Sequence, residues 1–243
     1  MSQWPGGDRR DPSATDRHYL ALRPLSTALQ GEVAKHLTGR SGLDVLDIGC
    51  GVKPYQPFFA PYAATHRGLD AVPGPYVDDV GHAEALPYED ESFDVILCTQ
   101  VFEHLHEPWT AVKEMRRVLR PGGLALVSTH GVFLYHPDPP GSDQDYWRWT
   151  HSGLRRLFES HGTWNSIGVE GCGEMLSCVG YVLAQFLGEA VDRAPLSHAG
   201  ALAMRAFNRS VERMDRRFPP RARTPAGGSI SSTYLVSATR SGA

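Results

Sequence analysis

The chain has 243 residues, of which 41% are hydrophobic and 21% charged, the composition of an ordinary globular protein. This composition excludes disorder of the whole chain, and the net charge of -3 excludes a strongly basic nucleic-acid-binding protein. The four cysteines form no CxxC pair and no secreted ladder. We therefore expect reduced thiols, a cytoplasmic location and no metal-ligand set.

The first 17 residues lack the apolar segment of a signal peptide, and their composition predicts a mobile leader. Residues 18–243 are expected to form a single domain, because no internal repeat or long linker divides them. The longest apolar run, from Met175 to Gly188, is shorter than the ~20 residues that a membrane-spanning helix needs. The sequence therefore predicts no integral membrane protein.

Short apolar strands alternate with amphipathic helices through the first half of the chain. Apolar residues from Leu22 to Leu37 recur at helical spacing, and a second amphipathic helix is predicted at 108–119. Buried strands are expected at 43–48, 93–98 and 124–128, with another ending at Asp70. This alternation predicts a doubly wound α/β sheet, mostly parallel, with helices on both faces.

The second half begins with a helix capped by Thr150, followed by a strand near 164–169. Two helices at 174–191 and 197–218 then precede a last strand at 233–238, so residues 173–228 form a helical insertion. The segment 201–223 has a charge of +5, with arginines at every fourth position of the second helix. This pattern indicates a solvated helix face, with an anionic acceptor, a membrane surface or a dimer partner as alternatives.

A glycine-rich turn follows the first predicted strand, in the segment Val45-Leu-Asp-Ile-Gly-Cys-Gly51. In a doubly wound sheet such a turn lets a ligand approach the backbone closely. Asp70, at the end of the next strand, can accept hydrogen bonds from both hydroxyls of a ribose. The pattern therefore favours a nucleoside cofactor.

The same topology binds dinucleotides, but two features disfavour NAD. The pyrophosphate fingerprint GxGxxG/A is broken, because Pro54 occupies its third position. The stretch from Gly68 to Val112 also contains ten carboxylates and no Lys or Arg, which suits a cation better than a pyrophosphate. An NAD-dependent oxidoreductase is therefore the less favoured alternative.

Five motifs in order resemble those of class I S-adenosylmethionine-dependent methyltransferases of the type 11 group. They are the segments 45–51, 83–87 (AEALP), 92–96 (SFDVI), 103–105 (EHL) and 117–123 (RVLRPGG). Five ordered motifs are far more specific than a single glycine turn. The resemblance implies S-adenosylmethionine as cofactor and a Rossmann-like seven-stranded sheet whose last strand is antiparallel.

The resemblance also implies which residues hold this cofactor. His82 stands where many family members carry an aspartate, a departure from the family pattern. The matching positions are Asp47, Gly49 and Gly51 for the methionine and ribose side, Asp70 for the ribose hydroxyls, Ala83 and Glu84 for the adenine edge, and Thr99 and Gln100 for the methyl-donor pocket.

A sulfonium is already an activated electrophile, so the protein has mainly to align an acceptor with the methyl group and exclude water. Histidines and a tyrosine cluster after the fourth and fifth predicted strands, where loops meet at the carboxyl edge of the sheet. The candidate catalytic residues are His136, Tyr146 and His104, and the candidate acceptor-binding residues are Arg148, Trp147 and His130.

The segment 136–150 is similar to a His…Asp-Tyr-x-Arg-x-Thr signature of many type 11 members. Arg148 has two interpretations, which the sequence leaves open. It can meet a carboxylate or phosphate of the acceptor, or it can pair internally with Asp145 while Thr150 caps the next helix. His104 can likewise be a structural partner of Glu103.

These patterns predict an enzyme that transfers a methyl group from S-adenosylmethionine to a small-molecule, glycan or lipid-type acceptor. No nucleic-acid partner is expected, because the chain has no RNA-binding appendage. The alternative is a non-catalytic S-adenosylmethionine-binding protein that docks a partner through its late helices. The helices at 174–218 are candidates for an acceptor lid, a peripheral membrane contact or a homodimer interface.

Overall fold

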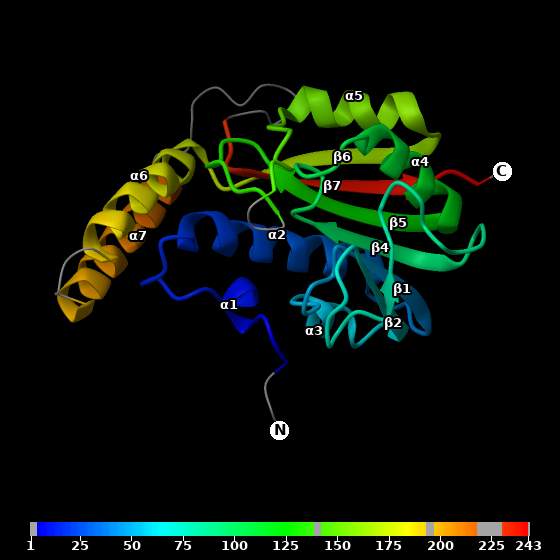
Figure 1. The fold of residues 1–243 in the computed structure, drawn as a ribbon, viewed down its shortest axis with the longest axis horizontal. Coiled ribbons are helices and arrows are strands. Elements are labelled where there is room, and N and C mark those ends of the chain that lie inside the picture. The colour runs from blue at the N-terminus through cyan, green and yellow to red at the C-terminus, as the bar shows by residue number, and fades with distance from the viewer. Residues whose placement is uncertain (1–3, 139–141, 193–196, 218–229, 243) are drawn as a thin grey trace.

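The computed structural model describes residues 4–138, 142–192, 197–217 and 230–242 (Figure 1). Residues 1–3 of the expected leader, and 193–196 and 218–228 of the expected insertion, lie outside this description. The strands are β1 (Leu43–Ile48), β2 (Ala63–Asp70), β3 (Asp79–Val80), β4 (Phe93–Thr99), β5 (Leu119–His130), β6 (Trp164–Cys172) and β7 (Thr233–Arg240).

All seven strands form one sheet in the order β3-β2-β1-β4-β5-β7-β6. The neighbours from β3 to β5 pair in parallel. β7 inserts between β5 and β6 and runs antiparallel to both. The predicted seven-stranded α/β fold, with its antiparallel last strand, is confirmed.

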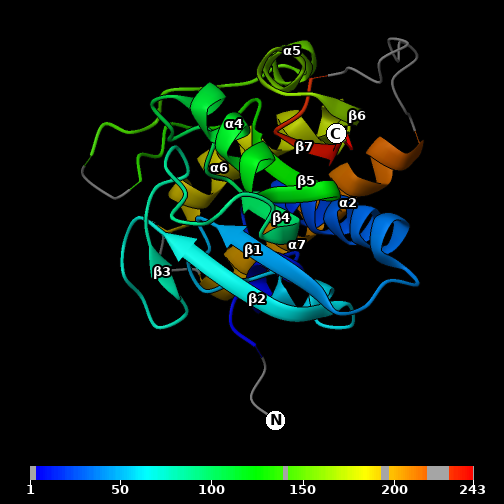
Figure 2. The same cartoon turned by 90° about the vertical axis from the view of Figure 1, so that its right-hand side faces the viewer.

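Helices cover both faces of the sheet and one of its ends (Figures 1 and 2). α4 and α5 pack on one face, and α2 and α3 pack on the other. α6 and α7 lie side by side near the amino end of α2. The bounds are α1 (Gly7–Arg10), α2 (Tyr19–Leu37), α3 (Gln56–Phe59), α4 (Pro108–Val118), α5 (His151–His161), α6 (Met175–Asp192) and α7 (Ser197–Arg217).

The central strands are apolar because they are covered on both sides. β1 and β4 are buried along nearly their whole length, as expected for parallel strands between two helical layers. α2 presents Leu25, Leu29 and Val33 at a spacing of four residues to one face of the sheet. Thr150 caps α5 as predicted, since its Oγ1 accepts a hydrogen bond from the backbone N–H of Gly153 at 3.0 Å.

The segment expected to be a mobile leader packs against the domain from residue 4 onward. Trp4 Nε1 donates a hydrogen bond to the carbonyl of Lys53 at 2.8 Å, beside the glycine turn. Further along, Asn208 Nδ2 of α7 donates to the carbonyls of Ala14 and Asp16 at 2.9 and 2.8 Å. A polar composition suggested mobility, but these long-range hydrogen bonds satisfy the backbone of the segment and tie it to two distant elements.

Two observations concern membrane insertion and the state of the cysteines. None of the described helices combines the length and apolar character required to cross a bilayer. All four cysteines, Cys50, Cys98, Cys172 and Cys178, are buried and free of disulfide bonds.

Candidate functional site

A ligand-sized cleft lies at the carboxyl ends of the parallel strands. It has a volume of about 780 Å³ and is lined by the turn after β1, the end of β2, the end of β4 and the loop after β5. Residues of α2 and α6 also line it. Ligands of open α/β sheets bind at this edge, in the crevice between strands whose connections leave in opposite directions.

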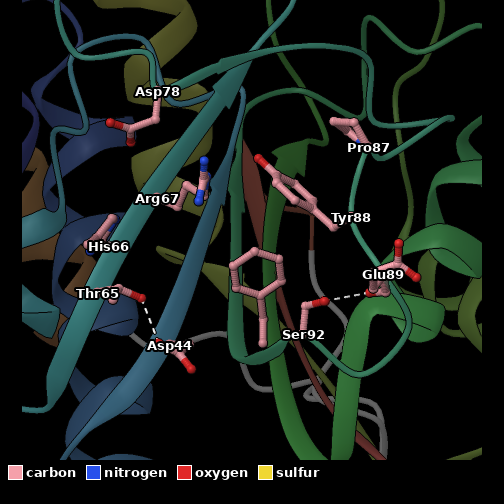
Figure 3. A pocket seen from close by; sticks show the side chains of 10 residues that line it. Asp44, Thr65, His66, Arg67, Asp78, Pro87, Tyr88, Glu89 and Ser92 are labelled. Atoms are coloured by element: carbon pink, nitrogen blue, oxygen red, sulfur yellow. Dashed lines mark hydrogen bonds between the residues drawn. The ribbon is translucent and has the colours of Figure 1, made fainter.

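A second hollow lies toward the amino ends of β1 and β4 (Figure 3). Several of its polar side chains are engaged with protein partners. Thr65 Oγ1 donates to Asp44 Oδ1 at 2.8 Å, and Ser92 Oγ donates to the carbonyl of Glu89 at 2.6 Å. The cleft at the carboxyl edge is therefore the candidate active site.

The glycine turn after β1 forms one wall of this cleft. Gly49 has φ +65°, and a Cβ added there would lie 2.3 Å from Val101 Cγ2, so this position needs glycine for both conformation and space. The backbone N–H groups of Gly49 and Cys50 both donate to the carbonyl of Leu69, at 2.8 and 3.1 Å. These bonds join the turn to the end of β2.

Asp70 ends β2 and lines the cleft beside the glycine turn. Its Oδ2 accepts from the N–H of Gly51 at 2.9 Å, and its Oδ1 accepts from the N–H of Val72 at 3.1 Å. Each carboxylate oxygen has a second lone pair, so the group can still accept hydrogen bonds from two vicinal hydroxyls. The arrangement fits the role in ribose binding that the sequence predicts.

The other predicted cofactor residues are divided between the cleft and its surroundings. Thr99 and Gln100 line it, and Gln100, at φ +58°, is held by Ser128, whose Oγ accepts from its Nε2 at 3.0 Å. Asp47 is buried beneath the turn, with Oδ2 3.5 Å from His66 Nε2. Burial raises the pKa of Asp47. Asp47, Ala83 and Glu84 are not among the described residues that line the cleft.

A cluster of imidazoles that line the cleft lies beside one buried carboxylate. Glu103 is fully buried, and its Oε2 accepts from Thr129 Oγ1 at 2.7 Å. Its Oε1 lies 2.9 Å from His130 Nε2, which in turn lies 3.1 Å from His136 Nε2. Burial alone would raise the pKa of Glu103, but His130 and Thr129 outweigh it and hold the pKa below its usual range.

Three of the predicted histidines therefore meet in one place, with Glu103 between them. His104, His130 and His136 all line the cleft. His104 Nε2 is 4.0 Å from Glu103 Oε1, so the expected pairing of these neighbours is looser than that of Glu103 with His130. Burial and the nearby His130 lower the pKa of His136, which favours its neutral form.

Of the two interpretations of Arg148 that the sequence left open, the structure shows the internal pair with Asp145. Arg148 Nη1 donates to Asp145 Oδ1 at 2.6 Å, and its Nη2 donates to Asp145 Oδ2 at 2.7 Å. The guanidinium also donates to the carbonyls of Phe133 and Leu134. Asp145 Oδ2 also accepts from the N–H of His136 at 2.9 Å. The pair thus fixes the loop that carries His136, and Arg148 is not among the described residues lining the cleft.

Tyr146 and Trp147 also lie outside the described lining of the cleft. Tyr146 is 44% exposed and packs edge-on against His106, and Trp147 Nε1 donates to the carbonyl of Leu105 at 2.8 Å. Their roles as a base and as an acceptor contact therefore gain no geometric support.

α6 supplies cleft residues that the sequence analysis missed. Tyr181 is buried and stacks on Phe133 with ring centroids 4.7 Å apart, and Gln185 Nε2 donates to the carbonyl of Arg17 at 2.9 Å. The apolar run of this helix gave no signal for them, because the face that packs inward carries the small and polar residues.

Comparison with known proteins agrees with this geometry. Residues 46–127 match the family described as "Methyltransferase domain". An uncharacterised methyltransferase of Mycolicibacterium vanbaalenii is 36% identical over 136 residues, which are 49% of this chain and 52% of that protein. The chain thus matches only about half the length of its curated relatives.

Two solved structures share the fold at low sequence identity. The [4+2]-cyclase SpnF has a TM-score of 0.56 at 19% identity, covering 90% of this chain and 82% of its own. Phosphoethanolamine N-methyltransferase 2 of Haemonchus contortus, described in complex with phosphomonomethylethanolamine and S-adenosylhomocysteine, has a TM-score of 0.55 at 15% identity. It is matched over 100% of this chain and 61% of its own.

The sheet order and the cleft at its carboxyl edge define a class I methyltransferase-type α/β protein. Within that class, residues 46–127 match the methyltransferase-domain family. The family that the five sequence motifs predicted is confirmed.

Proposed function

We propose that this protein transfers a methyl group from S-adenosylmethionine to a small-molecule, glycan or lipid-type acceptor. One observation carries the proposal: the glycine turn, Asp70 and the cluster of histidines all line a single cleft. A methyl donor and an acceptor group have to meet in such a space for an in-line displacement.

In this proposal Gly49, Gly51 and Asp70 hold the ribose side of the cofactor, and Thr99 and Gln100 lie next to the reacting methyl group. Asp47 acts from below, by supporting the turn. Ala83 and Glu84 follow β3, outside the described lining of the cleft, and are proposed to contact the adenine when the cofactor is bound. The acceptor enters between the histidine cluster and Tyr181 of α6.

The reaction itself is a single displacement. The nucleophilic atom of the acceptor forms a bond to the methyl carbon while the carbon–sulfur bond breaks, and its electron pair remains on sulfur. S-adenosylhomocysteine leaves as a neutral thioether. The protein contributes alignment and exclusion of water, and an imidazole of the cluster, such as His104, assists removal of the acceptor's proton.

Calorimetric titration of the purified chain with S-adenosylhomocysteine and, separately, with NAD tests the cofactor assignment. We expect saturable one-site binding of the first and none of the second. Loss of the labelled methyl group from S-adenosylmethionine is then followed with pools of hydroxylated, carboxylated and lipid-linked acceptors. Tight binding with no methyl transfer to any pool would favour a non-catalytic binding protein, and binding of NAD alone would contradict the proposal.

We further propose that α6 rests on a lipid surface while its inner face lines the cleft. Its outer face exposes five apolar side chains at helical spacing, Val179, Val182, Leu183, Phe186 and Leu187, with Phe186 73% exposed. The neighbouring α7 exposes arginines, including Arg205, Arg209 and Arg213. Apolar and cationic faces together suit an anionic lipid interface.

Sedimentation with vesicles of anionic or neutral phospholipid measures this contact. The wild type is expected to bind anionic vesicles, and Phe186→Ser combined with Leu183→Ser to release them. Val80→Ser, at an equally apolar and exposed position on β3, is the control and should bind as the wild type does. A concentration-dependent dimer that the double variant abolishes, without vesicle binding, would assign the face to a second copy instead.

A further inference from the structure

The cluster of His130, His136 and Glu103 has an arrangement that hydrogen bonds alone do not account for. Each of the three residues offers one potential ligand atom, and these atoms all lie within 4.8 Å of one another. Two of the separations are 2.9 Å, between His130 Nε2 and Glu103 Oε1, and 3.1 Å, between the two Nε2 atoms. Three potential donor atoms therefore converge on one point beside the cleft.

The tautomer of His136 follows from its second nitrogen. Its Nδ1 lies 3.1 Å from the carbonyl oxygen of Leu134, which can only accept, so Nδ1 carries the proton and Nε2 presents a lone pair. That lone pair points to His130 Nε2. A single proton on His130 Nε2 cannot point to both His136 Nε2 and the carboxylate.

Glu103 shows the same incomplete pairing. Its Oε2 accepts from Thr129 Oγ1, but Oε1 is fully buried and has no hydrogen-bond donor in suitable geometry among the described residues. A buried carboxylate oxygen without a hydrogen-bond donor lowers the stability of the folded state. A cation between Oε1 and the two Nε2 atoms would satisfy all three atoms at once.

We propose that Glu103, His130 and His136 bind one divalent transition-metal ion, with the donor set that zinc takes in catalytic sites. Two imidazoles and one carboxylate at 2.0–2.2 Å leave one position open. Tetrahedral ligands at those bond lengths are about 3.3 Å apart, close to the two short separations here. The carbonyl of Leu134 on His136 and the hydroxyl of Thr129 on Glu103 are the outer partners that orient such ligands.

The open position faces the cleft, because His130 and His136 line it. An oxygen acceptor bound there would lose its proton to solvent more readily, since a metal ion lowers the pKa of a coordinated hydroxyl. The oxygen could then attack the methyl carbon as the carbon–sulfur bond breaks. This role rests on the proposed methyl transfer, whereas the metal site itself does not.

Titration of the metal-stripped protein with Zn²⁺ in a competing chelator tests the site directly. We expect one equivalent bound by the wild type and an affinity lower by at least about 100-fold in His136→Gln and Glu103→Gln, because even changes to outer partners cost about 10- to 100-fold. His36→Gln, at the far end of α2 from the cleft, is the matched control and should keep full affinity.

Two readouts separate this inference from the proposed function and from misfolding. Binding of S-adenosylhomocysteine should persist in His136→Gln, and Zn²⁺ should raise the melting temperature of the wild type but not of that variant. Thr129→Val, which keeps all three ligands, should weaken Zn²⁺ by about 10- to 100-fold. Absence of stoichiometric Zn²⁺ in the wild type, or its retention in His136→Gln, would overturn the metal site whatever the cofactor result.

Discussion

The Asp70 carboxylate accepts a hydrogen bond from the backbone N–H of Gly51 at 2.9 Å, so the acid that ends β2 is fastened to the glycine turn that ends β1. This bond makes the two cofactor elements one unit. A substitution at either residue should therefore alter the position of the other.

Asp70→Asn should weaken binding of S-adenosylhomocysteine by roughly 10- to 100-fold, because one strong acceptor for a ribose hydroxyl is lost, at a cost of about 1–3 kcal/mol. Isothermal titration calorimetry measures the change. Glu89→Gln removes a carboxylate from the other hollow and should bind as the wild type does. Equal affinity in Asp70→Asn and the wild type would remove Asp70 from the cofactor site.

Gly49→Ala tests the close approach in the turn. The new Cβ would meet Val101 Cγ2 at 2.3 Å, so we expect a loss of stability of about 2–4 kcal/mol from overpacking and left-handed strain together. Gly42→Ala has the same left-handed backbone, φ +70°, with open space around it, and should lose only about 1 kcal/mol. Urea unfolding compares the two, and similar losses would contradict the steric argument.

Asp145 should contribute to stability in a pH-dependent way. Burial would raise its pKa, but Arg148 and the N–H of His136 outweigh burial and lower it from 3.8 to about 2. A depressed pKa stabilises the fold above the unfolded value, and this gain disappears as the pH falls toward 2. Asp145→Asn should therefore cost about 1–2 kcal/mol at pH 7 and progressively less below about pH 4.

Urea melts of Asp145→Asn at successive pH values follow this difference. Asp143→Asn, two residues earlier in the same loop and exposed, should match the wild type throughout. A deficit that is the same at pH 7 and near pH 3 would mean that the charge of Asp145 is not its source.

Asp215 of α7 caps the start of α6 across 38 residues of sequence. Its carboxylate accepts from the N–H groups of Leu176 and Ser177, at 3.1 and 3.0 Å, and from Ser177 Oγ. Asp215→Ala should therefore destabilise the protein by about 1–3 kcal/mol and loosen α6 over the cleft. Ser210→Ala, on the exposed side of the same helix, should change stability by less than about 0.5 kcal/mol in thermal melts. Equal effects would show that the cap is not needed.

The sequence predicted the central strands well because their signals are local. β1 was expected at 43–48 and is found there, since a strand buried on both faces is a short, continuous apolar run. β3 and α1 were missed, because two and four residues are too few to show a period. β5 begins at Leu119 instead of 124, because pairing with Phe93 of β4 extends it.

The acceptor side was harder to predict because its contacts depend on tertiary packing. In α7 the apolar residues Ala203 and Met214 are exposed, while the polar residues Asn208 and Asp215 are buried. Those two polar side chains are accommodated by partners on the leader and on α6, which no periodicity could reveal. The histidines of the cleft were predicted individually, but their meeting at Glu103 needed the fold.

The position of β7 bears on how the chain is assembled during translation. β6 has no neighbour in the sheet other than β7, and β7 is made after both α6 and α7. During translation, β6 therefore lacks its partner in the sheet until residues 233–240 have been synthesised. The parallel strands β3 to β5 can pair early, whereas the edge beyond β5 is completed only after α6 and α7 have been made, when β7 supplies both missing ladders.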